Sequence, residues 1–294
     1  MIGELSGLGC AAAWAVISTV MRSLSEKISP VVVNGLRCGF ATITLVLLVV
    51  LLGHAGAVAR LPLAGVAAIL ASGVLGQTVG DAVFVRSMKL LGASRAMPIS
   101  SINPMLTLIL AVAFLGEPLT WGAAGGTLLV ICGVYLLAFP YNPLAHGAHP
   151  RGPSEKLGLM LALLAATCWS LSTILLRVGL ASVDIFVANA VRMGTATVLL
   201  LGLDTFQSHG RIPVGLSRRS LVVVGMAGVL SAFSSLMFLT AVHYAGAAKA
   251  ATLSSTAPLF GLPLSIFFLR EKFSRRIVLG TLLAVFGIWL VVGG

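Results

Sequence analysis

Apolar runs long enough to cross a lipid bilayer follow one another along nearly the whole chain. A spanning α-helix needs about 20 predominantly apolar residues, and charged residues make up only 9% of the 294 positions here. An ordinary soluble domain carries roughly 25% charged residues, so this chain has too few charges to cover a water-facing surface. The runs therefore predict an all-α integral membrane protein, and they exclude a soluble enzyme and a disordered chain.

The same runs predict ten transmembrane helices joined by short connections. The longest connection, 140–156, is rich in Pro, Gly and His, which is typical of a surface linker. It separates residues 1–139 from residues 157–294, and each part holds five predicted helices. The ten helices are expected near 3–21, 30–52, 62–85, 94–116, 119–139, 157–177, 184–203, 219–242, 247–269 and 275–292.

The two parts are copies of one unit, because matching residues recur at a nearly constant spacing. The offset is 155 residues as far as Leu75, which matches Leu230, and it becomes 154 by Gly92, which matches Gly246. So many matches at one spacing indicate duplication. Further pairs are Trp14/Trp169, Asn34/Asn189, Arg37/Arg192, Ser100/Ser254, Ser101/Ser255, Pro104/Pro258 and Glu117/Glu271.

An odd number of helices in each copy reverses the polarity of the second copy in the membrane. The chain is therefore predicted to contain two inverted five-helix repeats, an arrangement typical of secondary transporters that work by alternating access. Two equivalent conformations can then exchange the roles of the two repeats around one central site.

The distribution of basic residues predicts which side of the membrane holds the termini. The chain has 19 Lys and Arg against 8 Asp and Glu. Fourteen of the basic residues fall in the connections after the odd-numbered predicted helices and three on the opposite side, while Arg37 and Arg192 lie inside helices. The positive-inside rule places the richer side in the cytoplasm and both termini outside it. The multi-pass protein is expected in the plasma (inner) membrane.

Both repeats end on a motif that resembles a known family. Phe114-Leu115-Gly116-Glu117 and Phe268-Leu269-Arg270-Glu271 are each followed by a Gly-rich apolar helix, as in an EamA domain. Ten helices, an inverted repeat and two such endings together resemble an EamA-type member of the drug/metabolite transporter superfamily. The resemblance implies an exporter of amino acids or related metabolites, with a central cavity lined mainly by helices 1, 3, 4, 6, 8 and 9. Members are usually drawn with cytoplasmic termini, which the charge distribution here contradicts.

Asp81 is the deepest acidic residue of the predicted helices. A charge inside a bilayer costs at least about 2.5–3.5 kcal/mol on insertion scales unless it faces a cavity or a partner. One interpretation is a proton carrier or a ligand for a substrate ammonium, and the other is an ion pair with Arg86 or Lys89. Its repeat mate is Ser235, so any role of Asp81 breaks the symmetry.

Helices 4 and 9 each carry a central proline, Pro104 and Pro258, which removes an N–H and predicts a kink. Carbonyls freed by the kinks could bind a polar metabolite beside hydroxyl and amide side chains, or the kinks could serve packing alone. Trp14 and Trp169 lie in mid-helix and are candidate walls of the same cavity, or large core residues. The remaining candidate cavity residues are Ser18, Gln77, Ser100, Ser101, Asn103, Thr173, Ser234, Ser235, Ser254, Ser255 and Thr256.

Arg37 and Arg192 lie about two turns inside helices 2 and 7. They could contact a substrate carboxylate or phosphate, although snorkelling of the guanidinium to the nearest interface is the favoured expectation. Helices 5 and 10 are almost wholly apolar and are expected to face lipid or a second subunit.

These observations predict a secondary transporter, not an enzyme, that exports small polar metabolites such as amino acids or their derivatives. No Lys follows a Gly, so a P-loop is absent, and we expect no cofactor, no metal and no nucleic-acid partner. The expected partners are a small-molecule substrate, the bilayer and a coupling proton. Two alternatives stay open: a transporter of anionic metabolites such as nucleotide sugars or organophosphates, and a scaffold or lipid-handling protein without solute flux.

Overall fold

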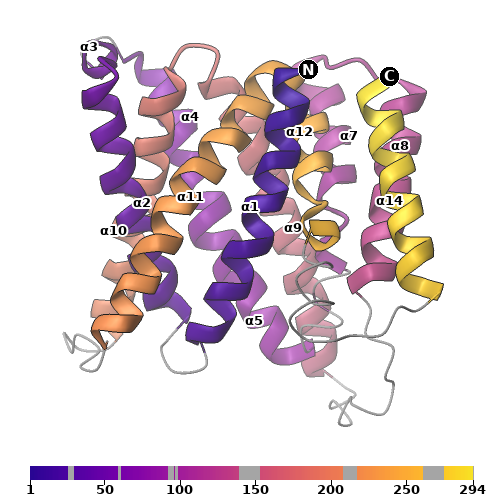
Figure 1. The fold of residues 1–294 in the computed structure, drawn as a ribbon, viewed down its shortest axis with the longest axis horizontal. Helices are drawn as coiled ribbons and strands as arrows, with labels where there is room; N and C mark the ends of the chain where they lie inside the picture. The colour runs from indigo at the N-terminus through magenta and orange to yellow at the C-terminus, as the bar shows by residue number, and fades with distance from the viewer. Residues whose placement is uncertain are drawn as a thin grey trace.

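The computed structural model describes residues 1–25, 30–58, 61–91, 96, 99–138, 153–207, 217–260 and 275–293. Every regular element in these ranges is a helix, and the helices run along a common direction in one bundle (Figure 1). The elements are α1 (Ile2–Ser25), α2 (Pro30–Leu51), α3 (Ala55–Val58), α4 (Leu63–Gly73), the π-helix η1 (Val74–Gly80), α5 (Asp81–Leu91), α7 (Asn103–Leu115), α8 (Trp121–Ala138), α9 (Pro153–Gly179), α10 (Ile185–Gln207), α11 (Arg218–Ala245), α12 (Ala247–Ser254) and α14 (Arg275–Gly293).

Five of the described helical stretches are long and apolar enough to cross a membrane, and four shorter apolar helices accompany them. The expectation of an all-α membrane protein is therefore confirmed. The count of ten helices stays a prediction, because parts of the expected spans 94–116 and 247–269 lie outside the described residues. The two termini lie at the same edge of the bundle (Figure 1).

The two repeats interlock, because the most extensive helix contacts join one repeat to the other. The indigo helix α1 packs on the orange helix α11, α2 packs on α10 and α11, α5 packs on α9, and α8 packs on α14 (Figure 1). Glycines allow the closest approaches: a Cβ on Gly126 would lie 2.7 Å from the Gly287 carbonyl oxygen, and one on Gly133 would lie 2.6 Å from that of Gly280. Small residues of this kind let helices associate within a bilayer.

Glu117 also ties the two repeats together. Its carboxylate accepts hydrogen bonds from the backbone N–H groups of Ala247, at 2.7 Å, and Ala248, at 3.2 Å. These N–H groups open α12 and have no partner within the helix. Gly246 precedes them with φ of 89°, a conformation that favours glycine, and a Cβ there would lie 2.9 Å from Glu117 Oε1. A carboxylate from the first repeat therefore caps a helix of the second.

The third expected helix of the first repeat contains a π-helical turn that its counterpart lacks. The first repeat has one more residue between Leu75 and Gly92 than the second repeat has between Leu230 and Gly246. In the structure η1 occupies this part of the first repeat, whereas α11 is α-helical throughout. A π-turn holds one residue more than an α-turn, so η1 absorbs the extra residue and the flanking helices keep their register.

Candidate functional site

Asp81 directly follows the π-helix, and its backbone N–H donates to the carbonyl of Gly76, five residues earlier. Its side chain points across the bundle toward elements of both repeats. Trp169 on α9 donates its indole N–H to Asp81 Oδ1 at 3.0 Å, and the Asn34 amide on α2 donates to Oδ2 at 3.5 Å. A Cβ on Gly80 would lie 2.9 Å from Trp169 Nε1, so the glycine lets α9 approach η1 closely.

Arg37 extends this network from the other side of Asn34. Its Nε and Nη2 donate to Asn34 Oδ1 at 3.1 and 2.7 Å, and its Nη1 donates to Ser231 Oγ on α11 at 2.8 Å. The guanidinium carbon lies 5.4 Å from the ring centre of Trp14, within cation–π range. Only 2% of Arg37 is exposed, so its charge is held inside the bundle and does not reach toward the interface.

Neither of the cations that the sequence offered for an ion pair contacts Asp81. Arg86 and Lys89 are exposed on α5, and the ion pairs between described residues are those of Glu4 with the N-terminal amine and of His54 with Asp184. Two neutral donors, Trp169 and Asn34, bond the acid, while Arg37 and Arg192 are buried in the same bundle.

The second repeat contains a partial counterpart of this network. Asn189 donates its amide N–H to Ser235 Oγ at 2.8 Å, as Asn34 does to Asp81. The Arg192 Nη2 lies 3.4 Å from Ser172 Oγ on α9. A hydroxyl thus stands in the second repeat where the first has a carboxylate.

The prolines lie at helix breaks and not in the middle of continuous helices. α7 begins at Asn103, so Pro104 occupies its first turn, and Ser101 and Ile102 form a turn before it. In the second repeat α12 ends at Ser254, and Pro258 likewise lies just after a turn. The expected kinks are therefore breaks, because proline fits the first turn of a helix better than its interior.

Asn103 at the first break contacts α9: its side-chain and backbone oxygens accept from Ser170 Oγ at 2.9 and 3.0 Å. Ser100 beside it is buried and Ser101 is partly buried. Gln77 donates to Met193 Sδ at 3.4 Å, and Ser234 donates to the Cys10 carbonyl at 3.3 Å. Five further hydroxyls donate back to carbonyls of their own segment: Ser18, Thr173, Ser254, Ser255 and Thr256.

The candidates from the sequence did not include Asn34, Asn189 and Ser231, which belong to the site. Asn34 and Asn189 were visible as one of the repeated pairs, and a repeated amide inside an apolar helix is the signal that could have identified them. Ser231 carries no such signal, because serine is common in membrane helices and only the fold places it beside Arg37.

Five buried side-chain polar atoms of the described residues find no hydrogen-bond partner: Gln77 Oε1, Thr78 Oγ1, Asn189 Oδ1, Arg192 Nε and His243 Nδ1. Unpaired polar atoms in a low-dielectric interior are costly, so such atoms point to water or a ligand. The described residues contain no group of three or more His, Cys, Asp or Glu that could hold a metal ion.

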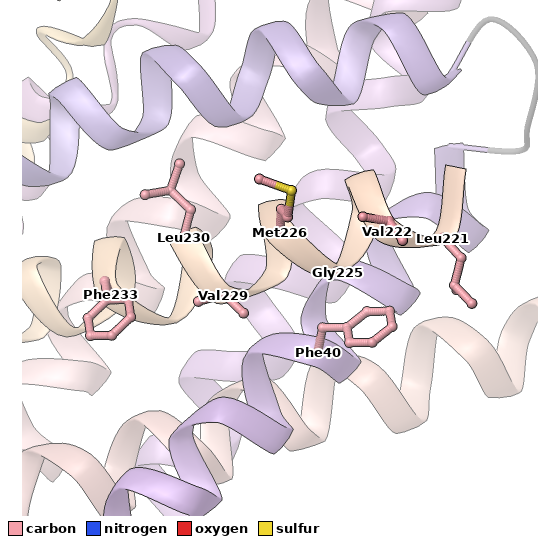
Figure 2. A pocket seen from close by; sticks show the side chains of 8 residues that line it. All are labelled: Phe40, Leu221, Val222, Gly225, Met226, Val229, Leu230 and Phe233. Atoms are coloured by element: carbon pink, nitrogen blue, oxygen red, sulfur yellow. The ribbon is translucent and has the colours of Figure 1, made fainter. Parts of the chain in front are cut away.

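A groove of about 670 Å³ lies along α11, between it and Phe40 of α2 (Figure 2). No polar side chain lines it, and Val222, Met226 and Phe233 are exposed there. In a bilayer this groove faces acyl chains, so it is unsuited to a polar solute. Its lining residues are Phe40, Leu221, Val222, Gly225, Met226, Val229, Leu230 and Phe233.

Comparisons with known proteins agree with this architecture. The model of the EamA-like transporter family matches residues 1–139 and 156–293. An uncharacterized transporter of Archaeoglobus fulgidus is 27% identical over 291 residues, covering 99% of this chain and 98% of that protein. A protein of known crystal structure shares the fold with a TM-score of 0.78 at 19% identity, over 98% of this chain and 95% of that one. The chain belongs to the EamA-like transporter family and is a multi-pass membrane transporter.

Proposed function

We propose that this transporter is a secondary exporter of small polar metabolites, amino acids and their derivatives among them, and that it works by alternating access around a central site. The observation that carries the proposal is the hydrogen-bonded network from Trp169 through Asp81 and Asn34 to Arg37. It joins side chains of both repeats in the interior of an apolar bundle. Polar groups inside a membrane are costly and therefore mark substrate or ion pathways.

The inverted relation of the repeats supports alternating access over a fixed scaffold. Asn34 and Asn189 bond to equivalent positions of the two repeats, so each repeat supplies one wall of the polar centre. Movement of one repeat against the other would open this centre to either side of the membrane in turn. A scaffold protein would need no such centre, and its polar groups would pair completely.

The direct test is flux through the purified protein in proteoliposomes, with a panel of labelled metabolites loaded either inside or outside. We expect saturable flux of polar solutes that empty liposomes lack. Trp169→Phe removes the N–H that Asp81 accepts, and we expect it to slow flux by roughly tenfold or more, the cost of a hydrogen bond to a charged group.

Trp121→Phe is the matched control, because Trp121 is 95% exposed and lies outside the network. Its flux should equal that of the wild type. A properly folded protein without flux of any solute in the panel would favour the scaffold alternative. Equal flux in both variants would remove the network from the transport pathway.

A further inference from the structure

The two repeated arginines, Arg37 and Arg192, occupy equivalent positions but differ in how their hydrogen bonds are satisfied. In the first repeat, Arg37 Nε and Nη2, which form one edge of the guanidinium, both donate to Asn34 Oδ1, at 3.1 and 2.7 Å. The remaining nitrogen, Nη1, donates to Ser231. Arg37 therefore has no edge left for a ligand, and it fixes Asn34 in the orientation that bonds Asp81.

The same edge of Arg192, Nε and Nη2, is largely without hydrogen-bond partners, and we call it the open edge. Its Nε finds no hydrogen-bond partner among the described residues, and its Nη2 reaches only Ser172 Oγ, at 3.4 Å. Asn189, which corresponds to Asn34, also donates its amide N–H to the equivalent position, here Ser235, but its Oδ1 has no hydrogen-bond partner. The arginine–asparagine contact that closes the first repeat is thus not made in the second.

The open edge belongs to a residue of which only 8% is exposed. The guanidinium packs against η1: a Cβ on Gly76 would lie 3.3 Å from Arg192 Nη2, and one on Gly73 would lie 3.4 Å from its Cγ. Glycines of the third helix therefore make the room in which this side chain lies. Bulk water does not reach such a position freely, so the open edge lacks the solvation that a surface arginine has.

The polar centre, formed by Arg37, Asp81, Arg192 and the side chains bonded to them, holds more basic than acidic groups. The buried groups Arg37 and Arg192 are basic and Asp81 is the acid bonded to Asn34, and no ion pair between described residues includes any of the three. A buried cation is stable only when an opposite charge and hydrogen bonds compensate for its lost hydration. With Asp81 ionised the centre holds two cations and one anion, and the open edge of Arg192 is where a hydrogen-bond acceptor is missing.

We propose that the Nε–Nη2 edge of Arg192 binds the carboxylate group of the transported solute, so that Arg192 is the anion subsite of the transporter and Arg37 is a positioning residue. This assignment rests on the transport function proposed above. Two parallel N–H donors match the two oxygens of a carboxylate, and the pair forms short, charge-assisted bonds. With Asp81 ionised, a single carboxylate also balances the charges of the two cations.

The test measures binding as a rise in the melting temperature of the purified full-length protein in detergent. The probes are sodium propionate and sodium phenylacetate, with propionamide and phenylacetamide as neutral analogues and sodium chloride and sodium phosphate as inorganic references. We expect a saturable rise with the carboxylates and none with the amides. Arg192→Gln should weaken carboxylate binding at least tenfold, while Arg86→Gln, which removes an exposed cation from α5, should leave it unchanged.

Arg192→Lys keeps the charge and loses the planar edge, so its affinity should fall between those of the wild type and Arg192→Gln. Without any probe, Arg192→Gln should be at least as stable as the wild type, whereas Arg37→Gln should be less stable because Arg37 makes four side-chain hydrogen bonds. A carboxylate effect that survives in Arg192→Gln would overturn the assignment. So would the absence of any saturable effect in the wild type, or equal stabilisation by the amides.

Two outcomes separate this subsite from the proposed function. Carboxylate binding that depends on Arg192 in a protein without flux would refute transport and leave the subsite standing. Flux that Arg192→Gln leaves intact would refute the subsite and leave transport standing. Stabilisation by phosphate that equals the carboxylate effect and vanishes in Arg192→Gln would replace the carboxylate with a phosphoryl group.

Discussion

Asp81 is held by two neutral N–H donors, of Trp169 and Asn34, and forms no ion pair with a described residue. This arrangement differs from a closed ion pair, in which a strong salt bridge would fix the acid in one protonation state. A carboxylate bonded by neutral groups can exchange a proton when its surroundings change during transport. We therefore propose Asp81 as the residue through which a proton gradient would drive solute movement.

Asp81→Asn tests this role, because the amide keeps the shape of the side chain and loses the titratable group. We expect accumulation driven by a pH gradient to vanish and passive counterflow to survive, both measured in proteoliposomes. Asp184→Asn is the control: Asp184 caps α10 by accepting from Phe186 and Val187, and asparagine caps equally well. Gradient-driven transport that persists in Asp81→Asn would end the proton-carrier hypothesis.

At the level of single residues, the sequence predicted part of the site. Asp81, Trp169 and both arginines stand out because polar groups in apolar runs are rare and because the repeat pairs them. The partners of these residues could not be predicted, since Ser231 lies 194 positions from Arg37 and nothing local indicates that they meet. The ion pair with Arg86 or Lys89 was a local expectation, and the π-helical turn before Asp81 directs the acid elsewhere.

Among the elements, η1 shows how one extra residue is accommodated in a packed bundle. An insertion into an α-helix turns every following side chain by about 100° unless a wider turn absorbs it. The position of the extra residue in η1 could have been inferred from the change of the repeat offset between Leu75 and Gly92. The sequence alone, however, does not distinguish a wider turn from a longer loop.

Deletion of Val79 from η1 should be tolerated, because the π-turn can then become an ordinary α-turn while α4 and α5 keep their positions. Deletion of Val229 from α11, which has no such turn, should rotate one half of that helix and prevent correct packing. The two valines have similar exposure, 37% and 43%, so they form a matched pair. Yield and melting temperature after extraction from the membrane measure the difference, and equal damage by both deletions would contradict the role of η1.

The cap of α12 by Glu117 predicts a cost that belongs to an element and not to the transport site. Glu117→Ala leaves the N–H groups of Ala247 and Ala248 without acceptors and should lower the free energy of unfolding by about 0.5–2 kcal/mol. Glu117→Gln keeps one acceptor oxygen and should lose less. Unfolding curves of the two variants check the order, and identical curves for Glu117→Ala and the wild type would refute the cap.

At the scale of the whole molecule, the unequal distribution of basic residues predicts extracytoplasmic termini. A reporter that is active only in the cytoplasm should be silent when it is fused after Gly294. The same reporter inserted in the 140–156 linker, which carries Arg151 and Lys156, should be active. A strongly active reporter at the C-terminus would restore the orientation usually drawn for this family.

The fold itself was largely predictable, since apolar runs of membrane length and a constant offset leave few architectures open. What the sequence could not show is that the repeats interlock. Five predicted helices per repeat are compatible with two repeats that pack as separate halves and with two repeats that interlock. The packing of α1 on α11 and of α8 on α14 shows that they interlock.

Interlocking has a consequence for biosynthesis. A ribosome adds about 5–20 residues per second. Since α14 starts at Arg275 and its partner α8 at Trp121, α14 follows roughly 8–30 s later, and α11 follows α1 after a still longer interval. During that interval the first repeat lies in the bilayer with lipid against the glycine faces of α1 and α8, which no later helix yet covers. The first half therefore cannot complete its packing until the second half has been made.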